Sequence, residues 1–332
     1  GQKRITKTYY QKRCYKVVVN MSASPTNDPT ELPHQPAIAT SSVVTTPRGV
    51  ATALGAYTLW GFFPLYFKQL ADYDAVEIIG HRVIWSFVFV LLLLVVRRHW
   101  QWLGVVRREP KWLLYTLISG TIIATNWLTY VWAVNHNHML EASLGYFISP
   151  LAGVLLALVV LQERLRPLQW LAIGLALVGV GVQLVLLGKL PWVTLLLAAT
   201  FSVYGLMHRR TPLDALSAMF IETALLVPAC VVWFWQADVA SSHVAFWLSP
   251  SIWLLMLAGP ITLIPLLMYN KSTKMVAFSL LSFLNYLSPT IVFLLAVLVY
   301  HEAFDSSRLI TFGCIWLGLI FFSYDLFKQR KH

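Results

Sequence analysis

The chain has 332 residues, of which 58% are hydrophobic and only 12% are charged. A soluble globular domain carries about 25% charged residues, so this composition, with a mean hydropathy of +0.66, excludes a disordered protein, a nucleic-acid-binding domain and an ordinary cytosolic enzyme. The formal net charge is +11, but most Lys and Arg residues lie between long apolar runs, so a lipid bilayer is the expected partner and nucleic acid is not.

Residues 1–47 are expected to form a disordered tail. Residues 1–20 are basic and need not belong to the native protein, whereas residues 21–47 are rich in Ser, Thr, Pro and Ala, a composition that buries too little apolar surface to fold. The apolar stretch Val17–Val19 is far shorter than the roughly 7–15 residues of a signal-peptide core.

Ten apolar runs follow the tail, and each is long enough for a membrane helix, which needs about 20 apolar residues. They lie near residues 49–70, 77–96, 112–134, 140–161, 168–188, 190–207, 215–235, 251–270, 275–300 and 307–327. The backbone polar groups of a span must be satisfied within it, which favours helices over open strands. The expected fold is an all-α membrane protein with ten transmembrane helices and a short C-terminal tail, 329–332.

Lys and Arg residues are distributed unequally between the two sets of loops. The set that contains the 97–111 loop and both ends of the hydrophobic region has 15 of them, and the opposite set has only Lys68, Lys189 and Arg308. Cytoplasmic loops carry the excess of positive charge in membrane proteins. Both termini are therefore expected to face the cytoplasm.

The sequence contains an internal repeat with a constant offset. Ser143–Pro150 matches Ser282–Pro289, and the ungapped comparison of residues 143–179 with 282–318 gives ten identities across 37 positions, including Glu163 with Glu302. Because each half would hold five helices, an odd number, the second copy enters the membrane from the opposite side. Residues 48–188 and 189–328 are thus predicted to be inverted repeats, the architecture of many secondary transporters.

Several motifs resemble those of a known family. They are Trp60-Gly61, the run EIIGHRVIW at 77–85, Asn126-Trp127, the run from Trp132 to Pro150, and Glu163-Arg-Leu. With these motifs the chain resembles the EamA-type drug/metabolite transporters, and more closely their RarD group, over residues 48–328. The resemblance implies two EamA repeats, a bacterial cytoplasmic membrane and transport of small molecules. It also implies that the helices near 140–161 and 275–300 border a central cavity.

Ionisable residues within spans are functional candidates because each costs roughly 2.5–3.5 kcal/mol at the centre of a membrane helix. Glu77 and His81 lie four residues apart on one helix face, next to Arg82. They form either an interfacial cluster that sets helix packing or a site that handles protons or substrate. Glu222 lies deeper in its span and is the first candidate for proton exchange.

Three other carboxylates have simpler explanations. Glu141 begins the 140–161 run, where a carboxylate suits the positive end of the helix dipole, although ion handling remains open. Glu163 and Glu302 each precede a helix, and capping of that next helix is the expected role.

Uncharged polar and aromatic residues in the spans are candidates for a substrate pathway, with hydrogen bonding between helices as the alternative. They are Trp60, Asn126, Tyr130, Tyr146, Ser149, Tyr204, Asn285, Tyr286 and Ser288. Pro64, Pro150 and Pro289 are expected to kink their helices, since each removes a backbone donor. Pro150 and Pro289 are related by the repeat, so matching kinks are expected.

Cofactor signals are weak throughout the sequence. Cys14, Cys230 and Cys314 lack metal-ligand spacing, and His136 and His138, two residues apart, do not share a helix face. No nucleotide-binding GxxxxGK[ST] loop occurs, so neither a metal, a cofactor nor ATP is expected. A monomer or weak homodimer is expected.

A secondary transporter that moves a small organic metabolite or drug-like solute by alternating access, in the direction of export, accounts for these features best. The alternatives are a receptor that does not transport and an intramembrane lipid-modifying enzyme. An enzyme is disfavoured because the inner loops offer only the widely spaced Glu109, Glu163 and Asp214.

The charge distribution generates a topological prediction. In a cysteine-free background, single cysteines at positions 104 and 137 should react differently with a membrane-impermeant thiol reagent added to intact cells. The reagent should label position 137 and not position 104. The reverse pattern would overturn the orientation.

Overall fold

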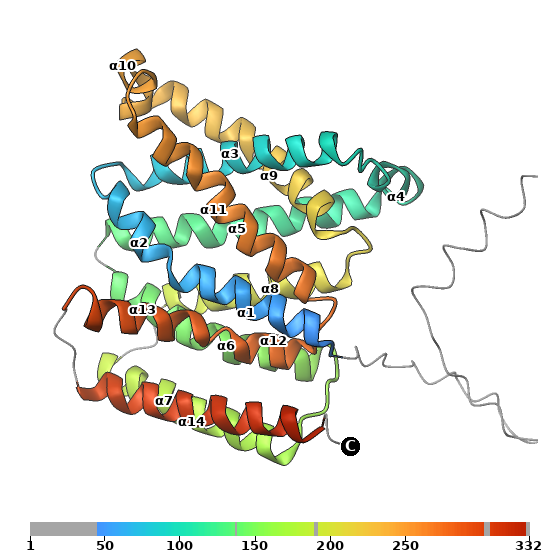
Figure 1. Ribbon diagram of the computed structural model, residues 1–332, viewed down its shortest axis with the longest axis vertical. Helices are drawn as coiled ribbons and strands as arrows, with labels where there is room; N and C mark the ends of the chain where they lie inside the picture. The colour runs from blue at the N-terminus through green and yellow to red at the C-terminus, as the bar shows by residue number, and fades with distance from the viewer. Residues whose placement is uncertain (1–44, 137, 189–191, 302–305, 330–332) are drawn as a thin grey trace, which may run out of the picture. The chain divides into compact units, whose positions relative to one another are not determined.

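The structure is a computed structural model that describes residues 45–136, 138–188, 192–301 and 306–329, and every regular element in these ranges is helical. Figure 1 shows their arrangement. The elements are α1 (Pro47–Gly61), α2 (Phe63–Phe67), η1 (Lys68–Leu70), α3 (Ala75–Val96), α4 (Trp102–Arg108), α5 (Lys111–Asn135), α6 (Met139–Val159), α7 (Pro167–Leu187), α8 (Trp192–Arg210), α9 (Ala215–Gln236), η2 (Ala240–Ser242), α10 (Val244–Trp247), α11 (Ser251–Ser272), α12 (Phe278–Leu284), α13 (Leu287–Leu298) and α14 (Ser306–Gln329).

Side-chain caps fix the starts of three long helices. Asp74 accepts hydrogen bonds from the first turn of α3, and Asp214 does the same for α9, which satisfies backbone donors that a helix leaves free. Thr46 caps α1, which begins at Pro47, and the Thr46 N–H donates to the Met275 carbonyl at 3.0 Å. The expected tail 1–47 therefore ends before residue 45, and its residues 1–44 lie outside the described ranges.

Seven helical segments in the described residues are long and apolar enough to cross a membrane: 47–70, 75–96, 141–159, 167–186, 215–236, 251–272 and 278–298. A shorter apolar helix covers Leu309–Asp325. Helices α5 and α8 occupy the two remaining expected runs and are more polar. Each expected run thus contains helix in the described residues, and seven of the runs have the composition of a span.

The three prolines expected to kink their helices behave differently. Helix α6 is continuous through Pro150, whereas the matching segment is divided at Asn285 and Tyr286 into α12 and α13. The Pro289 ring keeps the Asn285 carbonyl from its normal helical partner, and that carbonyl accepts from Ser288 N–H at 3.1 Å instead. Pro64 lies in the first turn of α2, after the break at Phe62. Of the two repeat-related prolines, Pro289 therefore follows a helix break, whereas Pro150 lies within a continuous helix.

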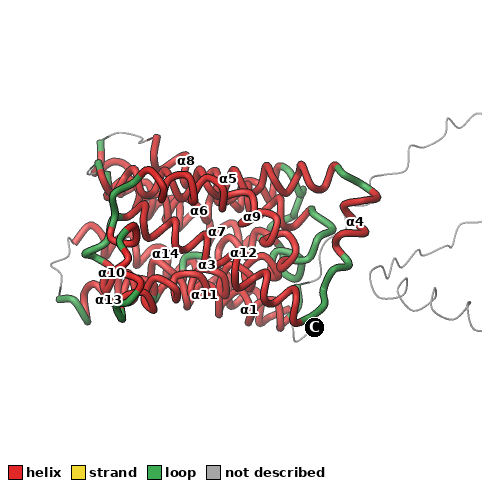
Figure 2. Tube along the Cα trace, turned by 90° about the horizontal axis from the view of Figure 1, so that it is seen from above, coloured by secondary structure: helices red, strands yellow, loops and turns green. Residues whose placement is uncertain are grey.

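The long helices lie side by side, with their axes running roughly along one line, up or down (Figure 2). Helix α3 packs against α9 and α11, α5 packs against α8 and α9, and α6 packs against α8 and α12. The main hydrophobic core lies among these helices and includes Tyr57, Tyr204, Phe283 and Tyr286, all fully buried. Helices α7 and α14 pair along their length at one edge (Figure 1).

The α7–α14 pair is joined by two reciprocal contacts. A Cβ atom added to Gly179 would lie 3.0 Å from the Thr311 carbonyl oxygen, and one added to Gly318 would lie 2.9 Å from the Ala172 carbonyl oxygen. At the offset of the sequence repeat, Gly318 is the equivalent of Gly179, and Thr311 is the equivalent of Ala172. The two helices are therefore antiparallel and exchange the same contact in both directions.

This close approach predicts that Gly318→Ala destabilises the protein by about 1–3 kcal/mol, because backbone atoms must move to admit the methyl group. Thermal unfolding of the purified full-length chain in detergent measures the effect. Gly313→Ala is the matched control on the same helix, since no atom lies within 4 Å of its Cβ position. Equal unfolding temperatures for the two variants would contradict the packing.

Candidate functional site

A buried polar cluster surrounds Glu222, near the N-terminal end of α9. Its side-chain oxygens contact Ser119 Oγ at 2.7 Å, Tyr204 Oη at 3.1 Å and His208 Nε2 at 2.8 Å. Asn270 Nδ2 donates in turn to Tyr204 Oη at 2.9 Å. All five side chains are buried, so the carboxylate is solvated by protein groups instead of water.

The sequence positions these groups by helical spacing. Tyr204 and His208 lie four residues apart on α8 and share one face, and their rings contact each other at 4.5 Å. Gly120 on α5 admits α9, because a Cβ there would lie 3.2 Å from the Glu222 Cα. Asn270 Oδ1 is buried and has no hydrogen-bond partner among the described residues. The cluster therefore has one polar atom that is free to accept.

A second site centres on Arg82, the eighth residue of α3. Its Nε donates to Thr262 Oγ1 on α11 at 2.9 Å. The guanidinium lies 5.3 Å from the ring centres of both Phe67 and Trp127, a distance at which aromatic faces attract a cation. It also interacts electrostatically with Tyr130 and Tyr146. In the described part of the chain it forms no ion pair with a carboxylate.

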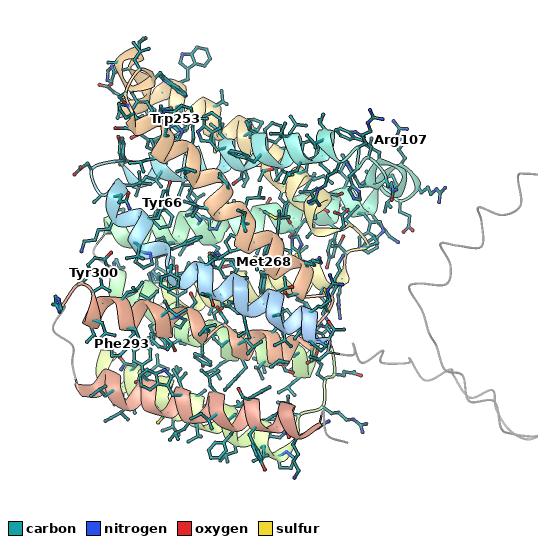
Figure 3. All side chains as sticks on the ribbon, viewed as in Figure 1. Tyr66, Arg107, Trp253, Met268, Phe293 and Tyr300 are labelled. Carbon is teal, nitrogen blue, oxygen red and sulfur yellow. The ribbon has the colours of Figure 1, made fainter. Side chains whose placement is uncertain are left out.

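Tyr130 and Tyr146, on α5 and α6, pack edge to face with ring centres 6.2 Å apart. Both remain accessible, with 36% and 51% of their surface exposed, although they lie several residues inside their helices. Tyr66 on α2, labelled in Figure 3, donates its hydroxyl to the Leu254 carbonyl at 2.6 Å. These rings form an aromatic collar around Arg82, which we define as Tyr66, Phe67, Trp127, Tyr130 and Tyr146.

Glu77 and His81 form a separate packing cluster beside the α9–α11 connection. The Glu77 carboxylate accepts from Ser241 N–H at 2.7 Å. Trp85 Nε1 contacts His81 Nδ1 at 3.2 Å, and the imidazole lies among Phe234, Phe246 and Trp247. These contacts hold the connection against α3, which fits the packing interpretation of Glu77 and His81.

Glu163 corrects one expectation, because it does not cap the helix that follows it. Its carboxylate accepts from Phe278 N–H at 2.7 Å and from Ser279 N–H at 3.0 Å, at the start of α12. It also forms an ion pair with Arg209 at 3.2 Å. The capping reaches across the fold to the other repeat because a helix N-terminus attracts any nearby carboxylate. Glu302 lies outside the described residues.

Cations reinforce this end of the fold. Arg209 donates to the Thr273 and Val276 carbonyls at 3.0 and 2.7 Å, and Lys274 donates to the Thr211 and Leu213 carbonyls. Burial lowers the pKa of Arg209, an effect that nearby Glu163 opposes, and burial lowers the pKa of Lys274, an effect that Asp214 opposes. The ends of α8, α11 and α12 are thereby tied together.

Comparison with known proteins identifies the family. The model of the EamA-like transporter family matches residues 47–185. An uncharacterized transporter of Pseudomonas aeruginosa is 48% identical over 86% of this chain and 96% of its own length. Protein RarD of Escherichia coli is 41% identical over 86% of this chain and 97% of its own. The chain belongs to the EamA-like transporter family.

Two further relatives of this EamA-family chain are informative. A second Pseudomonas aeruginosa protein, named chloramphenicol-sensitive protein RarD, is 34% identical over 84% of this chain and 94% of its own. A solved crystal structure that is 22% identical covers 82% of this chain and 96% of its own with a TM-score of 0.61, which shows a shared fold. The protein is thus a multi-pass membrane protein related to bacterial transporters.

Two further candidate residues, Asn126 and Trp60, make contacts between helices. Asn126 donates to the Leu197 carbonyl at 3.0 Å and to Thr200 Oγ1 at 2.8 Å, both on α8. The Trp60 ring packs against Tyr57, Phe201 and Tyr269. Asn126 therefore joins two helices, and Trp60 belongs to an aromatic contact between α1, α8 and α11.

The repeat segment in α6, α12 and α13 is mostly used for packing. Tyr286 Oη donates to the carbonyl of Phe147, its own repeat equivalent, at 3.0 Å. The Ser149 hydroxyl is buried without a hydrogen-bond partner among the described residues, Asn285 is buried and Ser288 is half-buried. Glu141 is buried at the start of α6, with His138 Nδ1 at 3.1 Å. Tyr286 joins the two repeats at equivalent residues.

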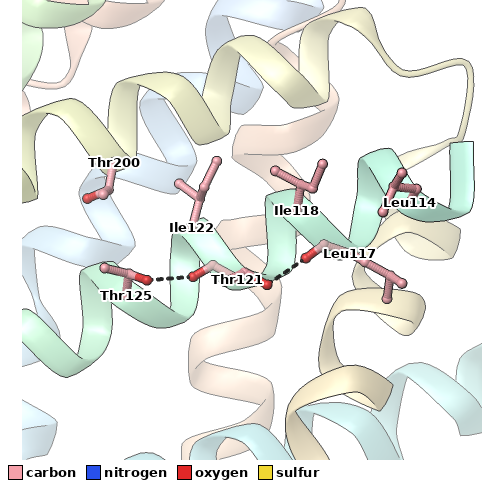
Figure 4. A pocket seen from close by; sticks show the side chains of 7 residues that line it. All are labelled: Leu114, Leu117, Ile118, Thr121, Ile122, Thr125 and Thr200. Carbon is pink, nitrogen blue, oxygen red and sulfur yellow. Dashed lines mark hydrogen bonds between the residues drawn. The ribbon is translucent and has the colours of Figure 1, made fainter. Parts of the chain in front are cut away.

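A groove of about 390 Å³ runs along α5 and reaches Thr200 (Figure 4). Its lining is mainly Leu and Ile, and the hydroxyls of Thr121 and Thr125 donate to carbonyls of their own helix, at 2.9 Å each. Neither the Glu222 cluster nor Arg82 contributes to it. Apolar contact is therefore what this groove can offer.

Three members of the Glu222 cluster were not predicted from the sequence: Ser119, His208 and Asn270. His208 directly precedes Arg209 and Arg210. Because these charges mark the end of the span, the local sequence did not indicate that His208 is buried. The Tyr204–His208 spacing of four residues was the available signal. In the described ranges, no group of three or more His, Cys, Asp or Glu side chains could hold a metal ion.

Proposed function

We propose that this chain is a secondary transporter that moves a small organic solute across the bacterial cytoplasmic membrane by alternating access, in the direction of export. Ten membrane-spanning helices form two inverted repeats, residues 48–188 and 189–328, with both termini cytoplasmic. The Glu222 cluster handles the coupling proton. Family membership supports the class of function, and the geometry supports the mechanism.

The reciprocal contact between α7 and α14 is the observation that carries the proposal. Gly179 meets Thr311 as Gly318 meets Ala172, and both pairs keep the offset of the sequence repeat. Two helices can exchange equivalent contacts in antiparallel orientation only if a two-fold axis relates them. Such an axis in the membrane plane supports two inverted repeats, whose substrate sites lie where the halves meet.

The pairing of the other helices supports the same symmetry. The repeat offset converts α3 into α9 and α5 into α11, and α3 contacts α11 as α9 contacts α5. Gly120 and Gly259, which the same offset relates, each admit the partner helix closely, at Glu222 and at Trp85. The more polar α5 and α8 pack among the apolar spans, which supports their inclusion in the ten.

The state of the two helix ends supports alternating access. Arg107 and Tyr300 lie at opposite ends of the helices (Figure 3), and the 97–111 loop marks the expected cytoplasmic end. At that end the Glu163–Arg209 ion pair joins the α6–α7 connection to α8 and α12. These contacts support a conformation that is closed towards the cytoplasm, while the rings of Tyr130 and Tyr146 near the other end remain accessible.

The Glu222 cluster has the chemistry of a proton site. An ionised carboxylate only accepts hydrogen bonds, whereas a protonated one also donates. Protonation of Glu222 would turn one acceptor into a donor and disturb its contacts with Ser119, Tyr204 and His208. Proton binding is thereby linked to the packing of α5, α8 and α9. The same burial argues against an enzyme site, because a lipid headgroup would have to reach a carboxylate that is only 3% exposed.

Counterflow in proteoliposomes tests the function itself. Purified full-length protein is reconstituted into vesicles loaded with one solute of a panel of neutral, anionic and cationic organic compounds, and uptake of the same labelled compound is followed. Transient accumulation in protein-containing vesicles, and none in empty vesicles, is expected for at least one solute. Failure of every solute would favour a receptor over a transporter.

Replacing Glu222 tests the coupling. Glu222→Gln keeps the size but cannot ionise, so accumulation driven by a proton gradient should be lost while counterflow persists. The matched control is Glu109→Gln, since Glu109 is half exposed and forms an ion pair with neighbouring Lys111 at 2.6 Å, away from the Glu222 cluster. Gradient-driven accumulation equal to the parent in Glu222→Gln would end the assignment of Glu222.

A further inference from the structure

Arg82, which is half-buried, differs from the other charges within the fold in what solvates it. Glu222 contacts three donor groups, Glu77 has a backbone N–H, and Arg209 has Glu163. Arg82 has one hydrogen bond, from Nε to Thr262 Oγ1. Its Nη1 and Nη2 atoms form no hydrogen bond with any residue that the structure describes. The two terminal nitrogens that can grip an oxyanion are thus left without a protein acceptor.

The surroundings of Arg82 are aromatic and accessible. The ring centres of Phe67 and Trp127 lie 5.3 Å from the guanidinium, and Tyr130 and Tyr146 are 36% and 51% exposed. Arg82 and Tyr146 are each the eighth residue of their helices, about 10 Å along the axis from the first residue. Arg82 and Tyr146 therefore lie at a similar depth from the ends at which α3 and α6 begin.

We propose that Arg82 binds the carboxylate of a small organic anion and that the aromatic collar contacts the apolar body of that anion. The substrate class is then a carboxylate with an aromatic or otherwise apolar body. This assignment rests on the proposed transport function and names the solute of its outward-facing site.

The chemistry of the guanidinium explains the choice. Arginine keeps its charge in proteins and presents paired donors whose geometry matches a carboxylate. Ring faces stabilise the cation without neutralising it, so the empty site tolerates the charge and a bound anion completes it. A cationic solute would be repelled, and a neutral amide would offer one acceptor oxygen and no opposite charge, so the site discriminates by charge.

Thr262 has a supporting role as a positioning residue. Its hydroxyl accepts a hydrogen bond from Nε and thereby leaves Nη1 and Nη2 for another acceptor. Tyr146 and Tyr130 carry hydroxyls with no hydrogen bond to a described residue, and these can donate to a carboxylate oxygen. The anion would therefore meet two nitrogen donors and up to two hydroxyl donors.

Binding to the purified full-length chain in detergent, measured by calorimetry, tests the proposal. The probes are benzoate, phenylacetate and indole-3-acetate, with benzamide and benzylamine as the neutral and cationic analogues of benzoate. At least one carboxylate should bind, and its neutral and cationic analogues should bind at least about 10-fold more weakly. Absence of binding by all three carboxylates, or equal binding of benzamide, would overturn the proposal.

Variants separate Arg82 from general effects of charge. Arg82→Gln should weaken carboxylate binding by about 10- to 100-fold, and Arg82→Lys, which keeps the charge without the paired geometry, should weaken it less. Arg107→Gln, in the exposed α4, should bind like the parent. Equal affinity of the parent and Arg82→Gln would contradict the assignment. If Arg82→Gln fails to fold, two other measurements test the assignment: the affinity of Arg82→Lys for the carboxylate, and the preference of the parent for benzoate over benzamide.

The transport assay keeps this inference distinct from the proposed function. Counterflow of neutral or cationic solutes only, unchanged in Arg82→Lys, would leave the transporter intact and overturn the anion site. Carboxylate binding without counterflow of any solute would retain the anion site and count against transport.

Discussion

A charge inside a membrane has to be solvated by the protein itself, and this constraint organises the structure. Insertion scales put the cost of a charge at the centre of a span at roughly 2.5–3.5 kcal/mol, so a retained charge needs partners from neighbouring helices. Glu222 draws α5, α8 and α9 together through Ser119, Tyr204 and His208. Glu77 fixes the α9–α11 connection, and Arg82 joins α3 to α11 through Thr262. The helix packing around the centre follows from these needs.

The two charges of greatest functional interest occupy similar positions within their helices, although at the repeat offset Arg82 corresponds to Ile221, one residue before Glu222. Arg82 is the eighth residue after the N-cap Asp74, and Glu222 is the eighth after the N-cap Asp214. In the proposed inverted repeat these neighbouring positions would lie near opposite membrane faces, with the cation on the outer side and the acid on the inner side. We interpret this as two different functions in similar helix positions: the helix packing is similar in the two halves, whereas the charged side chains differ.

Much of the fold could be predicted from the sequence because it depends on apolar runs and caps. The expected runs coincide with helices within a few residues, and the repeat offset recurs in the contacts of Gly179 and Gly318. Partners distant in sequence were harder. Glu163 caps α12, more than a hundred residues away, and His208 is hidden beside two loop arginines. Asn126 and Trp60 were predicted as pathway residues, but their contacts join helices, because polarity in a span marks packing as readily as it marks a cavity.

In the proposed mechanism, one end of the fold closes as the other opens. Paired distances between spin labels test this coupling most directly. One pair of labels at positions 164 and 271 reports on the inner end, and a second pair at positions 69 and 136 reports on the outer end. Removing the Glu163–Arg209 ion pair with Glu163→Ala should lengthen the inner distance and shorten the outer one, because the two ends are coupled. An unchanged outer distance while the inner end opens, or movement of both distances in the same direction, would contradict alternating access.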